Sequence, residues 1–424
     1  MQKVMSYFKQ ICEIPHLSYE TEKLRDFLVE FAKKYEFSVS VDKAGNIYTC
    51  KGEPKICLQA HYDMVGVGLA PKIELAQNDG FLSAKNSSLG ADNGIGVAII
   101  MAMMSEFSDF EAVFTNNEEV GLWGVREFSG KIKSKKMLNL DSEDENEVII
   151  GCAGSSEIKA VCSAKKIKAK GFVYEVFIDN FPGGHSGIQI DQNIPNAIKF
   201  LSKFIYEKGG KIAKFSGGER TNSIPAKASA VAVFDGELSE FPNFIKHKFL
   251  GLKECEILTN SDKILGVICA FSQGVRSFNT ELNLPNSSIN LSIATMKEDK
   301  FELLFYARAM SEEALNEVNF QTKALLGGFD FECKFGEFSL PWKPKVDEFS
   351  KFILKNLQKF VPNARLAAVH AGLECGVFIT KDPQISAVSI GPNITSPHSI
   401  NEKVELKSVE KIVNTVREIM ANLD

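Results

Sequence analysis

Short apolar segments alternate with amphipathic ones near the start of the chain. Three nearly unbroken apolar runs are typical of strands buried on both faces of a sheet: residues 56–60, 112–115 and 137–140. Apolar residues recur at helical spacing from Leu24 to Phe31, and residues 95–104 form a second expected helix after a glycine-rich turn. This alternation predicts an α/β layer over the first part of the chain.

The end of the chain repeats this texture, whereas the middle differs. Near the end, we expect a helix over residues 349–360, a strand over 386–390 and a helix over 409–420. In the middle, half-alternating patterns predict more exposed strands and two helices: strands at 172–178, 226–234, 287–296 and 301–307, and helices at 194–206 and 312–326. We therefore predict a discontinuous α/β domain, residues 1–155 and 339–424, with an α+β domain inserted over residues 156–338.

The composition is that of a globular protein without a nucleic-acid or membrane partner. The 424 residues exceed one typical domain, and the 44% of hydrophobic residues are enough for a real core. The net charge of -5 and the lack of a basic patch argue against nucleic-acid binding. The longest apolar stretch, residues 97–104, is too short to cross a bilayer, and the first residues are typical of helix rather than of a signal peptide.

The nine cysteines are scattered along the chain, and no two of them form a C-x-x-C pair. Their odd number and their spacing argue against a disulfide framework and against a cysteine-rich zinc site. We therefore expect reduced thiols in a cytoplasmic protein.

Acidic residues and histidines follow the carboxyl ends of the expected strands or lie in the loops between them. Ligand sites of α/β sheets lie beyond the carboxyl ends of strands, so we expect these side chains to converge on one rim: His61, Asp63, Asp92, Glu118, Glu119, Asp141 and His398. Such a cluster needs a counter-charge, because unpaired buried carboxylates are costly. Mixed histidine and carboxylate ligands suit zinc or a similar transition metal. Two divalent cations, three ligating carboxylates and one hydroxide would be close to neutral together.

Each of these segments has a plainer interpretation when it is taken alone. Residues 61–63 are then an ordinary hydrogen-bonded His-x-Asp pair, and residues 90–94 are a turn that leads into a helix. Glu118 and Glu119 are typical of a solvated loop, and Asp141 begins an acidic run. The order of the segments, and the position of each at a strand end, favour the metal site.

Several segments together resemble the M20 family of metallopeptidases and, within it, the bacterial Xaa-His (aminoacyl-histidine) dipeptidases. They occur in the family's order and span nearly the whole chain: residues 58–65 (LQAHYDMV), 88–96 (SLGADNGIG), 115–121 (TNNEEVG), 138–144 (LNLDSED), 183–187 (GGHSG), 370–376 (HAGLECG) and 396–399 (SPHS). The resemblance implies a zinc-peptidase-like mixed sheet flanked by helices, and a lid and dimerisation role for the inserted domain. It also implies metal-dependent hydrolysis of small peptides, with a dipeptidase of the Xaa-His type as the expected enzyme.

The resemblance implies two metal ions per chain with a shared ligand. His61, Asp92 and Asp141 would hold one ion. Asp92, Glu119 and His398 would hold the other, so that Asp92 bridges the two. Zinc is the expected metal, and manganese and cobalt suit the same ligands.

Glu118 and Asp63 would assist the two ions. By resemblance, Glu118 is the general base in hydrolysis by a bridging hydroxide. The side chains of the adjacent residues Glu118 and Glu119 point in different directions, so one can bind a metal ion while the other faces the metal-bound water. Asp63 lies two residues after His61, so both side chains point the same way, and its carboxylate can accept a hydrogen bond from the imidazole. The resemblance also implies a cis peptide bond between Asp92 and Asn93.

Further residues are expected to meet the substrate. By resemblance, His185 would lie on the lid and polarise the scissile carbonyl. In dimeric relatives, that histidine reaches across from the partner subunit. Taken alone, His185 is more simply interpreted as a histidine in a turn. Asn222 resembles the lid asparagine that helps to hold substrate, and Arg276 is a candidate for binding the substrate carboxylate. Gly372 and Glu374 would line the pocket for the substrate termini, by resemblance only.

Two other functions stay open from the sequence. A metal-dependent deacylase or amidohydrolase acting on N-acyl amino acids would use the same fold and metals, but its substrate has no free amine to bind. A non-catalytic binding protein would have lost the base or the ligands, and the sequence retains them all. The chain has no GxSxG nucleophile elbow, P-loop or dinucleotide fingerprint.

Overall fold

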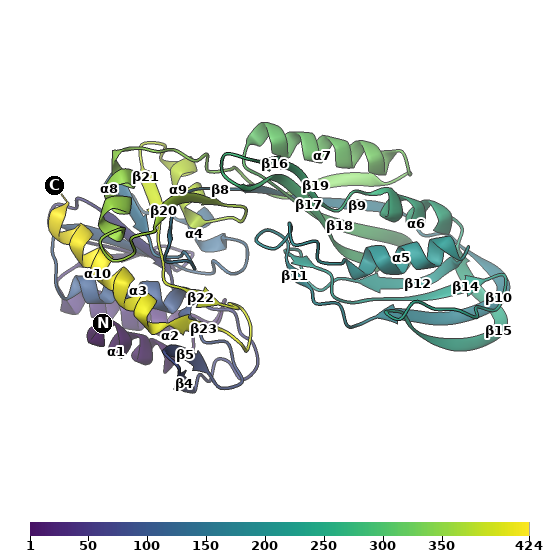
Figure 1. Ribbon diagram of the computed structural model, residues 1–424, viewed down its shortest axis with the longest axis horizontal. Helices are drawn as coiled ribbons and strands as arrows, with labels where there is room; N and C mark the ends of the chain where they lie inside the picture. The colour runs from purple at the N-terminus through teal and green to yellow at the C-terminus, as the bar shows by residue number, and fades with distance from the viewer. Residues whose placement is uncertain (424) are drawn as a thin grey trace. The chain divides into compact units, whose positions relative to one another are not determined.

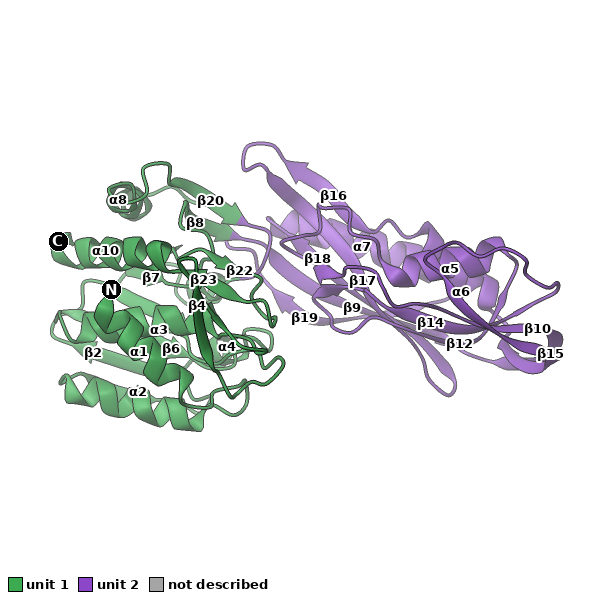
Figure 2. Ribbon diagram, turned by 60° about the horizontal axis from the view of Figure 1, so that its bottom comes forward, with its two compact units in different colours: residues 1–151, 344–368, 373–424 green, residues 152–343, 369–372 purple. Residues whose placement is uncertain are grey.

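The computed structural model describes residues 1–423, which divide into two compact units. Unit 1 comprises residues 1–151, 344–368 and 373–424, and unit 2 comprises residues 152–343 and 369–372 (Figure 2). Each unit has a hydrophobic core of its own, which is what makes it a separate folded body. The chain builds most of unit 2 in the middle of the sequence, returns to unit 1 at residue 344, and adds only residues 369–372 to unit 2 after that.

Unit 1 is built on an eight-stranded mixed sheet. In spatial order its strands are β1 (Ser38–Val41), β2 (Ile47–Lys51), β6 (Phe110–Thr115), β3 (Cys57–His61), β7 (Lys136–Asn139), β21 (Ser386–Ser389), β8 (Glu147–Cys152) and β20 (Arg365–Val369). The four neighbours β6, β3, β7 and β21 run parallel, whereas β1, β2 and β8 pair antiparallel with their neighbours. The carboxyl ends of the four parallel strands therefore meet at one edge of the sheet.

The helices of unit 1 pack around this sheet (Figure 1). They are α1 (Gln2–Cys12), α2 (Glu22–Lys34), α3 (Ala91–Met104), α4 (Trp123–Glu127), α8 (Glu348–Leu357), α9 (Glu374–Lys381) and α10 (Leu406–Asn422). The helix α3 is apolar and buried nearly all round, because it contacts β3 as well as α1 and α10. A small sheet with the order β22 (Ile394–Thr395), β23 (Lys403–Glu405), β5 (Phe81–Ala84) and β4 (Leu75–Asn78) completes the unit.

Unit 2 is an α+β domain with one large sheet whose neighbouring strands pair antiparallel. Its strand order is β15 (Lys246–Leu258), β10 (Lys166–Ile178), β14 (Ala228–Phe234), β12 (Lys211–Gly217), β17 (Leu284–Met296), β18 (Lys300–Ala309), β9 (Gly154–Ser163) and β19 (Glu332–Ser339), with β16 (Gly274–Asn279) beside β17. The helices α5 (Ala197–Glu207), α6 (Ser261–Ala270) and α7 (Glu312–Gly327) bury apolar residues against it. The short strands β11 (Gly184–His185) and β13 (Ser223–Ile224) pair with each other.

The expected α/β class is confirmed by this architecture. The three continuous apolar runs are the central strands β3, β6 and β7, as their pattern predicts. None of the helices within residues 1–423 has the length and apolar character that a membrane crossing requires.

Candidate metal centre

The ends of the parallel strands carry most of the predicted site residues of unit 1. His61 is the last residue of β3, and Asp63 follows two residues later. Glu118 and Glu119 lie in the loop that follows β6, and Asp141 lies just after β7. Five ionisable side chains thus come to one edge because the parallel strands β3, β6 and β7 all end there.

Asp92 joins this group from the start of α3, and His398 joins it from the loop after β22. The Nε2 atom of His61 lies 3.0 Å from Oδ1 of Asp92, while Nε2 of His398 lies 3.0 Å from Oδ2. Nε2 of His61 is also 3.4 Å from Oδ1 of Asp141, and Nε2 of His398 is 2.8 Å from Oε1 of Glu119. The two oxygens of Asp92 therefore face two different histidines.

Among residues 1–423, potential ligand atoms come within 4.8 Å of one another in three groups. The groups are His61 with Asp92 and Asp141, Asp92 with Glu119 and His398, and His61 with Glu118 and Glu119. The first two groups share Asp92, and they consist of the same residues as the two ligand sets that the family resemblance implies.

The backbone at the start of α3 brings Asp92 to this position. Gly90 has a φ of +69°, and a Cβ there would lie 3.0 Å from the sulfur of Met64, so the turn requires glycine. The Asp92–Asn93 peptide bond is cis, as expected. Gly96 lets the helix approach β7, because a Cβ at this residue would lie 2.7 Å from the carbonyl oxygen of Leu140.

Asp63 has more partners than the imidazole of His61 that the sequence predicts. The Nδ1 atom of His61 lies 3.0 Å from the main-chain oxygen of Asp63 and 3.5 Å from its carboxylate, so the carbonyl is the closer acceptor. The carboxylate accepts hydrogen bonds from the Ser18 hydroxyl (2.8 Å) and from the backbone N–H groups of Glu118 (2.9 Å) and Glu119 (3.3 Å). Asp63 thus fixes the loop that presents both glutamates, which sequence reasoning missed because these partners are distant in the chain.

The charges of the histidines and carboxylates show whether this cluster suits bound cations. Burial alone would lower the pKa of both histidines, yet Asp141 raises the pKa of His61 well above its usual value, and Glu119 and Asp92 raise that of His398 to about 12. Burial and the charge of Asp92 raise the pKa of Glu119 to about 7. The carboxylates therefore exceed the positive charge at hand, and the oxygen and imidazole donors are those that divalent zinc-like ions prefer. The residues fit two such ions.

Two further carboxyl groups, half-buried Glu143 and fully buried Glu374, interact with the charges of this cluster, and the strand-end argument did not single them out as ligands. Burial and the charge of Asp92 raise the pKa of Glu143 to about 8. Burial and the charge of Asp141 likewise raise the pKa of Glu374 to about 8, although the charge of His61 opposes this. Glu374 accepts hydrogen bonds from Gln59 (2.5 Å) and Thr115 (2.7 Å), and its side chain has no exposed surface to offer a substrate in this structure.

Known proteins are similar to this chain in sequence and in fold. The model of peptidase family M20/M25/M40 matches residues 57–422. The chain belongs to this family. It is therefore a hydrolase that acts on peptide bonds, and the family resemblance of its motifs is confirmed.

Individual relatives agree with this assignment. The peptidase is 28% identical to the cytosol non-specific dipeptidase of Escherichia coli (strain K12), over 100% of this chain and 98% of that protein. The crystal structure of aminoacylhistidine dipeptidase from Vibrio alginolyticus has 25% identity and a TM-score of 0.75, over 100% of this chain and 96% of that one. Aminopeptidase PepT from Bacillus cereus ATCC 10987 shares the fold at 14% identity and a TM-score of 0.61, covering 99% and 97% of the two chains.

His185 lies in unit 2 of the peptidase, where β11 pairs with β13. Its Nδ1 atom accepts hydrogen bonds from the backbone N–H groups of Gly187 (3.2 Å) and Ile188 (3.1 Å). A neutral imidazole in this arrangement carries its proton on Nε2, so that nitrogen is the donor of the ring. The main chain of Asn222 is adjacent, because its carbonyl accepts from the N–H of Ser186 at 2.8 Å.

A buried arginine lies beside this loop, and the sequence analysis missed it. Arg308 of β18 is 5% exposed, its Nε has no hydrogen-bond partner within residues 1–423, and burial lowers its pKa. A Cβ on Gly187 would lie 3.0 Å from this Nε and 2.6 Å from the carbonyl oxygen of His370. Arg276, the predicted candidate, lies on β16 and donates to Gln321 of α7 at 2.8 Å. The guanidinium of Arg308 packs 4.9 Å from the ring centroid of Tyr306, and a buried guanidinium whose Nε has no partner within residues 1–423 is the better receptor for an anion.

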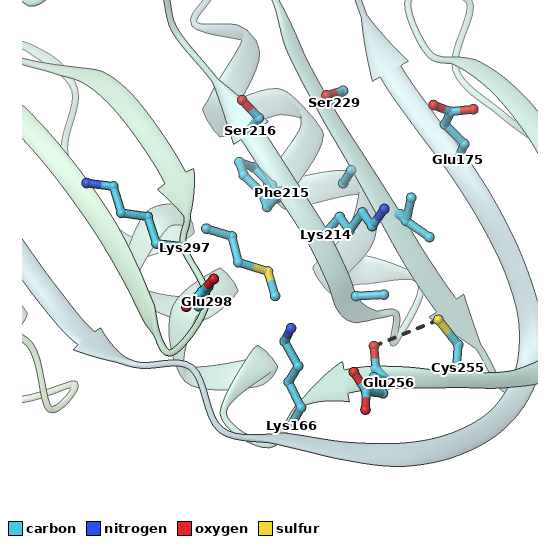
Figure 3. A pocket seen from close by; sticks show the side chains of 14 residues that line it. Lys166, Glu175, Lys214, Phe215, Ser216, Ser229, Cys255, Glu256, Lys297 and Glu298 are labelled. Atoms are coloured by element: carbon cyan, nitrogen blue, oxygen red, sulfur yellow. Dashed lines mark hydrogen bonds between the residues drawn. The ribbon is translucent and has the colours of Figure 1, made fainter.

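A depression of about 690 Å³ also lies on unit 2 of the peptidase (Figure 3). Charged side chains of both signs surround it, among them Lys166, Lys214 and Glu256. Within the described part of unit 2, its lining includes neither His185 nor Arg308. Because the proposed substrate-binding residues of unit 2 do not line this depression, we do not assign it as the catalytic site, although it is large.

Proposed function

We propose that the protein is a two-metal dipeptidase that hydrolyses small peptides, including dipeptides of the Xaa-His type. The observation that carries the proposal is the position of Asp92, whose two carboxylate oxygens face His61 and His398. A carboxylate between two ligand groups is suited to bridge two cations. The names of the Escherichia coli and Vibrio alginolyticus relatives support a dipeptide substrate.

The proposed ligands form two sets that share one residue. His61, Asp92 and Asp141 hold one ion, and Asp92, Glu119 and His398 hold the other. Zinc is the proposed metal, and manganese or cobalt would suit the same donors. Two bound divalent ions would supply Lewis acidity and lower the pKa of a shared water.

Glu118 is the proposed general base. Asp63 holds its backbone N–H, and burial together with the charge of Glu119 raises its pKa well above the usual value in the absence of metal. Its carboxylate takes a proton from the attacking water and returns it to the leaving amine. His185 is proposed to donate from Nε2 to the scissile carbonyl oxygen, since its Nδ1 is occupied by backbone donors.

The free carboxylate of the substrate needs a cationic receptor. Arg276 remains a proposal from the sequence, and the burial of Arg308, whose Nε has no partner within residues 1–423, makes it the stronger candidate. Asn222 and Gly372 are proposed to complete the substrate contacts, as the family resemblance implies.

The proposed setting is a cytoplasmic homodimer that forms through unit 2. The name of the cytosolic Escherichia coli relative supports the compartment. The resemblance to dimeric members of the family supports the assembly, in which His185 of one copy would serve the other.

The test is a substrate panel with metal analysis on the same preparation. The panel contains β-alanyl-histidine, dipeptides without histidine, a tripeptide and N-acetyl amino acids. Glu118→Gln is the inactive variant, and Glu127→Gln, an exposed glutamate on α4, is its matched control. We expect about two metal ions per chain in all three proteins, and dipeptide cleavage in the wild type and in Glu127→Gln only.

The other outcomes are equally informative. Cleavage of N-acetyl amino acids alone would assign the protein to the deacylases. Cleavage of dipeptides without histidine, but not of β-alanyl-histidine, would remove the Xaa-His specificity and keep the dipeptidase. Bound metal together with full activity in Glu118→Gln would remove that residue as the base.

A further inference from the structure

The segment that leads into α3 is held by a carboxylate from a distant part of the chain. Glu402 lies just before β23 and is 2% exposed. Its Oε2 accepts from the backbone N–H groups of Leu89 (2.7 Å) and Gly90 (3.1 Å), and its Oε1 accepts from those of Ala91 (2.8 Å) and Asp92 (3.4 Å). One side chain thus gathers four consecutive backbone donors.

This contact replaces the cap that α3 lacks. Gly90 occupies the N-cap position and has no side chain with which to accept a hydrogen bond. The first N–H groups of a helix have no partners within the helix, and they carry a partial positive charge that favours an anion. Glu402 supplies both the acceptors and the negative charge across roughly three hundred residues of sequence.

The two segments joined in this way each carry a proposed metal ligand. Asp92 is the last of the four residues that Glu402 holds, and His398 lies four residues before Glu402. The contact between Nε2 of His398 and Oδ2 of Asp92, at 3.0 Å, is a second link between the same segments. A rotation of residues 89–92 would move Asp92 relative to both ligand groups, because it belongs to both.

We propose that Glu402 is a positioning residue for the two-metal centre. By holding the backbone of residues 89–92, it fixes the two oxygens of Asp92 between His61 and His398. Glu402 acts through Asp92 and touches neither the metal ions nor the substrate. The inference rests on the proposed two-metal function. Groups that orient a metal ligand typically change metal affinity or activity by about 10- to 100-fold when they are replaced.

The test uses two substitutions at this residue and one matched control. Glu402→Gln keeps the size of the side chain, but its amide N–H₂ faces backbone donors; Glu402→Asp keeps the charge and shortens the reach. Glu405→Gln is the control, since Glu405 lies in the same segment and accepts from the side chain of Asn393 at 2.8 Å. Each full-length protein is measured for zinc affinity against a chromophoric chelator, for the visible spectrum of its cobalt form, and for kcat and KM on a dipeptide.

We expect Glu402→Gln to weaken zinc binding by about 10- to 100-fold and to change the cobalt spectrum, with Glu402→Asp intermediate and Glu405→Gln like the wild type. At saturating metal, kcat should fall more than KM rises, because the substrate contacts are unchanged. A Glu402→Gln protein that melts earlier after chelation, but keeps the wild-type affinity and cobalt spectrum, would overturn the inference, since a cap with a purely structural role has that signature.

The remaining outcomes separate this inference from the function on which it rests. If Glu402→Gln does not fold, Glu402→Asp decides by the same readouts: a weaker affinity and a changed spectrum support the positioning role, and wild-type values overturn it. A wild-type protein that binds two ions and cleaves dipeptides, beside unaltered Glu402 variants, refutes only the positioning role. A wild-type protein without metal or activity would overturn the proposed function and this inference together.

Discussion

Glu374→Gln should stabilise the metal-free protein at alkaline pH and leave its stability at acidic pH almost unchanged. Glu374 is fully buried, and burial, reinforced by the charge of Asp141, raises its pKa from 4.5 to about 8. Gln59 and Thr115 donate to one carboxyl oxygen, and a glutamine carbonyl accepts the same two hydrogen bonds. The substitution therefore mimics the protonated acid.

The sign and size of the effect follow from the two pKa values. Below about pH 4.5 the carboxyl group is protonated in the folded and the unfolded chain, and its contribution to stability is fully present. Between about pH 4.5 and 8 the unfolded chain ionises while the folded chain retains the proton, so the free energy of unfolding falls as pH rises. The difference of about 3.5 pH units corresponds to roughly 5 kcal/mol at most. Because the protein relaxes around a buried charge, we expect roughly 2–3 kcal/mol.

The assay is urea unfolding of the chelated protein at pH 5, 7 and 9. Trp123 lies in unit 1 with Glu374, and Trp342 lies in unit 2, so a Trp342→Phe background makes tryptophan fluorescence report on unit 1. Glu374→Gln should match its parent within about 0.5 kcal/mol at pH 5 and exceed it by roughly 2–3 kcal/mol at pH 9. The exposed Glu53→Gln is the control. A Glu374→Gln protein that differs from its parent equally at all three pH values would refute the reasoning.

Three further outcomes test the proposed chemistry. Glu118→Gln should lower kcat by about 10²- to 10⁴-fold while two metal ions stay bound, as measured by kinetics and elemental analysis; loss of the metal would instead make Glu118 a ligand. Arg308→Ala should lower kcat/KM by about 10- to 100-fold for a dipeptide with a free carboxylate, but not for its C-terminal amide, and Arg276→Ala should have the smaller effect. The reverse order would return the role to Arg276. If His185 acts across a dimer, mixing inactive His185→Ala and Glu118→Gln subunits should restore about a quarter of the wild-type activity, because half of the dimers are mixed and each has one complete site; absence of recovery in confirmed mixed dimers would place His185 in its own chain's site.

The exposed strands of unit 2 could not be predicted from the local hydrophobic pattern of the sequence. β15 and β19 are mostly exposed along their length, so they lack the apolar alternation that would announce them. β14 and β18 bury alternate residues over part of their length, β17 is buried over most of its length, and the apolar patterns of all three predict their positions. β15 and β19 are held by hydrogen bonds to a neighbouring strand rather than by burial of their side chains. The hydrophobic pattern of a short segment does not reveal which strand it will pair with.

The sequence by itself determined the central strands and the group of ionisable residues at their ends. Continuous apolar runs predict parallel strands that are covered on both faces. Parallel strands bring their carboxyl ends together, so the sequence alone predicts that His61, Glu119 and Asp141 are neighbours. The start of α3 was also close to expectation, because the backbone at Asp92 and Asn93 departs from helical angles and the regular helix follows them.

Only the tertiary structure decided how these residues are supported. Asp63 holds the loop of Glu118, Glu402 holds the segment of Asp92, and Arg308 lies buried without an anionic partner among the described residues. Each of these relations joins parts of the chain that are far apart, and each involves a residue type that occurs at many surface positions. A carboxylate or guanidinium acquires its role from the donors and charges that folding brings to it, and these are absent from its neighbours in sequence.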